Sequence, residues 1–131
     1  MITPAQIQVR FGDLDMMGHV NNSVYLSYFE YARVHYFNEI LGRDWDWKKF
    51  GCVVVKNEVN YHKSIFLNDV PVVTCFLEEI GAKSFTIGYQ MKVNDVLTTT
   101  GTTVLVCYDP KEQKAIEVSD DWRNALARLT K

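Results

Sequence analysis

The sequence predicts an α+β domain in which a curved antiparallel β-sheet surrounds one long central α-helix. One segment, residues 23–41, is apolar around most of a helical circumference, which is typical of a buried helix. Four stretches between residues 53 and 108 have the composition and alternation of β-strands, and short turn sequences separate them. Strands joined by short turns pair antiparallel, so the sheet is expected to wrap round the helix.

Length and composition indicate one domain, spanning residues 1–131, and charge bears on its partners. The 131 residues fit a single compact unit, and a 47% hydrophobic fraction is enough for a core and excludes a disordered chain. The formal net charge is −2 and no basic run occurs, which argues against a nucleic-acid partner. The aromatic fraction of 13% is high, and much of it lies on the long helical segment.

The N-terminal part predicts a strand, a loop and the helix. Ile7, Val9 and Phe11 alternate with polar residues, as in a half-buried strand, and residues 12–18 form a loop. Asn21 or Asn22 can cap a helix that runs from about residue 23 to residue 41. Gly42 is placed to end that helix.

The remainder predicts the sheet and a short C-terminal helix. Strands are expected at 53–61, 70–80, 84–93 and 97–108, with turns at 68–69, 81–83 and 94–95, and each connection is interpreted as a hairpin. In the first of these strands Val55, Val59 and Tyr61 are expected on one face. Ser119 is the predicted N-cap of the last helix.

The cysteines and the N-terminus indicate a cytoplasmic protein. Cys52, Cys75 and Cys107 form no CxxC pair, so they are interpreted as small buried hydrophobes in a reducing compartment. The first residues have no signal-peptide pattern, and no apolar run is long enough for a membrane span.

The segment before the long helix is the candidate site. A helix N-terminus presents free N–H groups and a partial positive charge, which polarise a carbonyl group and stabilise an oxyanion. Asp15 lies a few residues upstream, so its carboxylate and the helix N-terminus together form a minimal acyl-transfer site. The alternative is that Asp13 and Asp15 only cap turns. A metal site at Asp13, Asp15 and His19 lacks a fourth ligand, so no metal is predicted, and His35 and His62 are expected to be structural or surface residues.

Residues 13–25 also carry the pattern D-x-D-x-x-G-H-V-N-N-x-x-Y, which closely resembles the 4-hydroxybenzoyl-CoA thioesterase-like family. The resemblance extends over nearly the whole chain, including residues 81–85 and 115–118. That family has the hot-dog fold, a curved antiparallel sheet round a long helix. The resemblance implies an acyl-CoA thioesterase that needs no cofactor, because CoA is part of the substrate.

By this resemblance Asp15 is the catalytic carboxylate, acting either as a nucleophile through a mixed anhydride or as a general base. The backbone N–H of Asn22 matches the donor that polarises the thioester carbonyl. His19 resembles a histidine that assists catalysis in acyl-carrier-protein thioesterases.

The resemblance also implies substrate-binding positions. Gly18, Asn21 and Tyr25 are placed at the substrate, although Asn21 can instead shape the loop and the helical spacing of Tyr25 is also that of a core residue. Lys83 and Ser84 match a turn that meets the CoA phosphates in family members; the alternative is a plain hairpin turn with an exposed lysine.

The family further implies a homodimer or homotetramer with active sites at subunit boundaries. Two other functions stay open from the sequence: hydrolysis of acyl-carrier-protein thioesters, and non-catalytic binding of acyl-CoA on the same fold.

Overall fold

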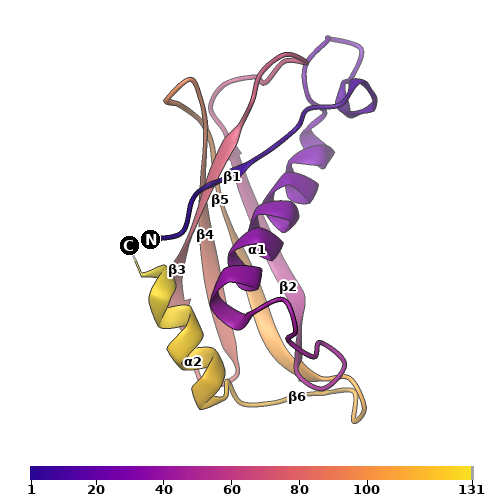
Figure 1. Cartoon of the computed structure of the whole chain (residues 1–131). Coiled ribbons are helices and arrows are strands. Elements are labelled where there is room, and N and C mark those ends of the chain that lie inside the picture. Colours follow the sequence, from indigo (N-terminus) through magenta and orange to yellow (C-terminus); the bar gives the residue numbers. More distant parts are fainter. Residues whose placement is uncertain (131) are drawn as a thin grey trace.

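The computed structural model describes residues 1–130 and shows one curled sheet packed against one long helix (Figure 1). The elements in chain order are β1 (Ala5–Gln6), α1 (Tyr25–Leu41), β2 (Gly51–Tyr61), β3 (Val72–Ile80), β4 (Ser84–Val93), β5 (Val96–Asp109), β6 (Lys114–Ala115) and α2 (Asp120–Leu126). Short 3-10 turns lie at Phe11–Asp13, Asn22–Val24 and Ala127–Leu129. The α+β class with a long central helix and a short C-terminal helix is confirmed.

The strand order is β1-β3-β4-β5-β2, with every pair antiparallel and β6 paired to the end of β5. The turns between β3, β4 and β5 are hairpins, as the sequence predicts. The prediction is wrong for the connection between β2 and β3, which crosses from one side of the sheet to the other over residues 62–71. This crossover passes the loop before α1, where the Val20 N–H donates to the Ile65 carbonyl at 2.8 Å.

The core lies between α1 and the concave face of the sheet. Phe29 of α1 stacks on Tyr89 of β4 with ring centroids 4.2 Å apart, and Phe37 meets Trp122 of α2 edge-on. The helix is not buried on all sides, because Tyr31 and Val34 are exposed on its outer face. Among residues 1–130, no helix is long and apolar enough to cross a membrane.

Both ends of α1 follow the sequence signals. The Asn21 side chain, rather than that of Asn22, caps the 3-10 turn Asn22–Val24 that leads into α1, and it accepts the Ser23 N–H at 2.9 Å; α1 itself begins at Tyr25. Gly42 ends the helix with φ at 85°, a conformation that favours glycine, and its N–H donates to the Asn38 carbonyl. Ser119 caps α2 as predicted.

Two strand predictions need correction. Only Ala5–Gln6 pairs with β3; Ile7 and Val9 are buried, but Phe11 is 81% exposed because the chain turns at that point. In β2, the register against β5 shifts between Val54 and Lys56. A bulge of this kind puts an extra residue on one strand and interrupts the alternation of faces, so Val55 does not stay in step with Val59 and Tyr61.

The cysteines behave as small apolar side chains. Cys75 and Cys107 are buried, Cys52 is half-buried, and none forms a disulfide among the described residues. Burial raises the pKa of the Cys52 and Cys75 thiols to about 12, so both remain protonated and unreactive at neutral pH.

Candidate active site

The segment before α1 folds back on itself as a closed loop, residues 14–20. Leu14 and Val20 pair as an isolated antiparallel bridge, and the Asp15 N–H donates to the His19 carbonyl at 2.9 Å. The Gly18 N–H returns to the Asp15 carbonyl at 3.1 Å, with the φ of Gly18 at 83°. Because few other residues adopt that conformation, Gly18 closes the turn that presents Asp15 and His19.

The Asp15 carboxylate is held by two neighbours. Its Oδ1 accepts the Met17 N–H at 2.9 Å, and its Oδ2 lies 3.5 Å from Nδ1 of His19. The two side chains are each about a third exposed, at 29% and 32%. The carboxylate is therefore oriented and still open to a substrate or a water molecule.

The N-terminus of the helix lies beside this carboxylate. Asn22 is the first residue of the 3-10 turn that leads into α1, and its N–H has no acceptor in the described part of the chain. The Tyr61 hydroxyl donates to the Asn22 carbonyl at 2.9 Å, so the end of β2 holds Asn22 through the peptide group that follows its N–H. An unpaired N–H at the positive end of a helix is a donor suited to a developing negative charge.

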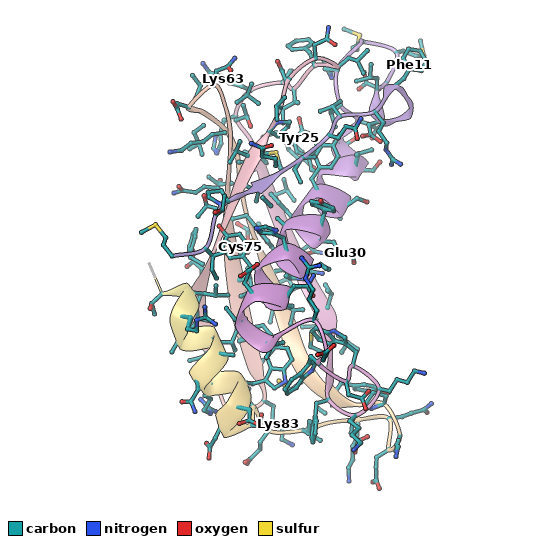
Figure 2. The ribbon with its side chains drawn as sticks, viewed as in Figure 1. Phe11, Tyr25, Glu30, Lys63, Cys75 and Lys83 are labelled. Atoms are coloured by element: carbon teal, nitrogen blue, oxygen red, sulfur yellow. The ribbon has the colours of Figure 1, made fainter. Side chains whose placement is uncertain are left out.

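A pocket of about 260 Å³ joins these groups. Asp15, His19 and Asn22 line it together with Tyr25 and residues 61–64. The structure thus brings four of the predicted site residues to one cavity, at the end of the sheet where Tyr25 and Lys63 lie (Figure 2).

Tyr25 is both a core residue and a wall of the pocket. It is buried, and its ring meets that of Tyr61 edge-on at 4.9 Å. Burial raises the pKa of the Tyr25 phenol, and the neighbouring Tyr61 and Asp15 raise it further. Tyr25 therefore stays protonated and presents a neutral wall beside the carboxylate.

The sequence analysis did not place Val20 or residues 61–64 in the site, although all of them line this pocket. His62, expected to be structural, bonds to Oγ1 of Thr100 through Nε2 at 3.0 Å and also lines the cavity. Nothing in the local sequence indicates this position, because it depends on the β2–β3 connection crossing the sheet beside the helix N-terminus.

The other predicted residues lie outside the cavity. Gly18 belongs to the loop, and Asn21 uses its side-chain oxygen to accept the N–H and the hydroxyl of Ser23. Lys83 lies near α2 at the opposite end of the sheet (Figure 2), and Ser84 is the first residue of β4.

The strand register gives the scale of this separation. Tyr61 pairs with Thr99 of β5, whereas Ser84 pairs with Val106 of the same strand. At roughly 3.3 Å per residue, Thr99 and Val106 are about 23 Å apart along β5. Within one chain, Lys83 and the pocket do not form a single site.

Comparisons with known proteins show which family the chain resembles. Residues 9–126 match the thioesterase-like superfamily. The chain is 29% identical over 129 residues to the long-chain acyl-CoA thioesterase FadM of Escherichia coli, covering 96% of this chain and 98% of FadM. A thioesterase from Thermus thermophilus, solved with coenzyme A and zinc, has a TM-score of 0.85 and 33% identity, covering 97% of this chain and 92% of that one. A predicted thioesterase from Bacillus stearothermophilus has a TM-score of 0.90 and 26% identity, with coverages of 98% and 96%.

Proposed function

Because the chain belongs to the thioesterase-like superfamily, we propose that it hydrolyses the thioester of an acyl-CoA to a free carboxylic acid and CoA. The observation that carries this proposal is that the Asp15 carboxylate and the Asn22 N–H, which has no acceptor among the described residues, both face one cavity. FadM and the coenzyme A-bound thioesterase of Thermus thermophilus support acyl-CoA as the substrate class.

In the proposed reaction the thioester carbonyl oxygen accepts the Asn22 N–H. Attack on the carbonyl carbon places negative charge on that oxygen, where the helix N-terminus stabilises it. Collapse of the tetrahedral intermediate breaks the C–S bond and releases CoA as a thiolate, which takes up a proton.

Asp15 supplies the attacking group by one of two routes. As a general base it takes a proton from water, and the hydroxide adds directly to the carbonyl carbon. As a nucleophile it forms a mixed anhydride, which water then hydrolyses to the acid and the free carboxylate. The 3.5 Å approach of His19 to Oδ2 supports a role for His19 in orienting Asp15 on either route.

The CoA moiety is elongated, with its thioester and its phosphates at opposite ends. We propose that the pantetheine arm passes Lys63 at the rim of the pocket, while Lys83 and Ser84 meet the nucleotide phosphates. Two separate contact regions are compatible with such a ligand, and Lys83 acts there as a point charge. Gly18 and Asn21 contribute by shaping the loop and the helix start around the carbonyl.

We further propose a homodimer with its active sites at the subunit boundary. β2 pairs only with β5 in the described sheet, so its other edge is open, and Val53, Val54 and Val55 are exposed along it. An open strand edge with exposed apolar residues favours pairing with a second copy. Since Tyr61 ends this strand and lines the pocket, a second chain at the β2 edge would border the pocket.

The test is a panel of short-chain, medium-chain, long-chain and aromatic acyl-CoAs, with free thiol as the readout and sedimentation velocity for the assembly state. We expect thiol release from at least one member and a dimer in solution. Background rates with every member would contradict the thioesterase proposal, and a monomer at assay concentration would contradict the dimer.

A further inference from the structure

The first aspartate of the motif, Asp13, occupies a different environment from Asp15. It is only 4% exposed, and its Oδ2 accepts the Tyr28 hydroxyl at 2.7 Å and the Arg10 N–H at 3.0 Å. Its backbone carbonyl accepts the Asn21 N–H at 2.9 Å. Asp13 therefore connects the start of the loop to the helix cap through its backbone and to the body of α1 through its side chain.

Asp13 is a buried charge rather than a buried acid. Burial disfavours the carboxylate, but the hydrogen bonds from Arg10 and Tyr28 and the charge of Arg10 more than offset this and lower the pKa of Asp13. The bond to Tyr28 therefore joins a neutral phenol to an ionised carboxylate, which makes it one of the stronger kinds of hydrogen bond.

From these contacts we propose that Asp13 and Tyr28 are positioning residues that set the distance between the Asp15 carboxylate and the Asn22 N–H. The loop of residues 14–20 is closed by its own hydrogen bonds, and its far end also pairs with the β2–β3 crossover. Asp13 lies at its base, and the Tyr28 bond fixes that base against α1, the helix whose first turn carries Asn22. This inference rests on the proposed thioester hydrolysis.

Both residues of this tether line a separate cavity of about 450 Å³, together with Arg10 and Tyr31. Asp13 and Tyr28 are absent from the lining of the pocket that holds Asp15. They affect the reaction through the loop, and small displacements of a reacting group are costly, about 10²-fold in rate for 1 Å. Loss of the tether should therefore lower kcat while leaving KM nearly unchanged.

The test compares Tyr28→Phe with Tyr36→Phe, a matched control on the same helix. Both side chains are buried tyrosines, and each substitution removes one hydroxyl. Tyr36 packs two turns further along α1, with its hydroxyl near Thr74 and Cys75, away from the loop. We expect similar decreases in Tm, but a decrease in kcat of about 10-fold or more for Tyr28→Phe alone.

Asp13→Asn and Asp13→Ala provide a second pair. Asparagine keeps an acceptor for the Tyr28 hydroxyl, so it should retain more of kcat than alanine does. Equal loss of kcat in Tyr28→Phe and Tyr36→Phe, or unchanged kcat in Tyr28→Phe, would overturn the proposal.

Amide hydrogen exchange at Asn21 gives a readout that does not depend on activity. Because the Asn21 N–H bonds to the Asp13 carbonyl, its exchange should accelerate in Tyr28→Phe and not in Tyr36→Phe. Unchanged exchange would overturn the tether even in an active enzyme. Faster exchange in a chain that hydrolyses no thioester would instead support the tether and contradict the proposed function.

Discussion

The two ends of the sheet hold their proposed substrate contacts in different ways. At one end, the loop of residues 14–20 fixes the Asp15 carboxylate through Met17 and His19 and is tied to α1 at its base. At the other end, the turn at 81–83 is fixed through its backbone: the Gly81 N–H donates to the Ser84 carbonyl at 2.7 Å and the Cys107 N–H to the Lys83 carbonyl at 2.9 Å. The Lys83 ammonium has no partner among residues 1–130.

This difference corresponds to two kinds of task. Bond breaking needs a reacting group within a few tenths of an ångström of its position, so its side chain has to be held. Attraction of a phosphate by a lysine needs only charge on a flexible stem. Substitutions at the held end should therefore act on kcat, and substitutions at the flexible end should act weakly and on KM.

The largest effect is expected for Asp15→Asn. Asparagine can still accept the Met17 N–H, so the fold and Tm should be retained, while the base or nucleophile is lost. We expect kcat to decrease on the order of 10³-fold or more in a free-thiol assay. Asp95→Asn, in the turn between β4 and β5, is the control and should leave kcat unchanged; near-normal turnover in Asp15→Asn would exclude Asp15 as the catalytic carboxylate.

Asn22→Pro should have the next largest effect. Proline lacks the N–H but fits the first position of a helix, and Asn21 before it already has φ −62° and ψ 138°, the conformation favoured before proline. Loss of an oxyanion donor typically lowers kcat by about 10²-fold or more.

Asn22→Ala is the matched control for this substitution, because it keeps the N–H and removes only the side chain. It should retain most of kcat. Equal rates for the proline and alanine variants would show that the Asn22 N–H does not stabilise the transition state.

Tyr61→Phe should have a moderate effect. It removes the hydrogen bond to the Asn22 carbonyl but keeps the ring that packs on Tyr25. A net hydrogen bond of about 1 kcal/mol corresponds to roughly a 5-fold decrease in kcat. Tyr108→Phe, at the far end of the same sheet, is the comparison and should not change kcat.

Lys83→Ala should have the smallest effect and a different character. We expect KM to rise about 3-fold at low ionic strength, with kcat unchanged, because a single exposed charge contributes little and is screened by salt. The measurement is KM for one acyl-CoA at two salt concentrations, with Lys111→Ala as control. A large decrease in kcat would contradict the division between the two ends.

Within the pocket, distance along the chain separates the residues that could be predicted from the sequence from those that could not. Asp15 and Asn22 lie within one local motif before an apolar helix, so their juxtaposition follows from chain proximity. Tyr61, His62 and Lys63 reach the pocket because the β2–β3 connection crosses the sheet, and a strand pattern does not specify which strands are neighbours. The bulge in β2 and the early end of β1 are also outside local patterns, since both depend on pairing with a distant strand.

The most direct test of the account is the crystal structure of Asp15→Asn bound to an uncleaved acyl-CoA. We expect the thioester carbonyl oxygen about 3 Å from the Asn22 nitrogen, with the carbonyl carbon facing the side chain of residue 15. A carbonyl bound elsewhere, beyond hydrogen-bond reach of Asn22, would contradict the proposal that this helix N-terminus is where the thioester is cleaved.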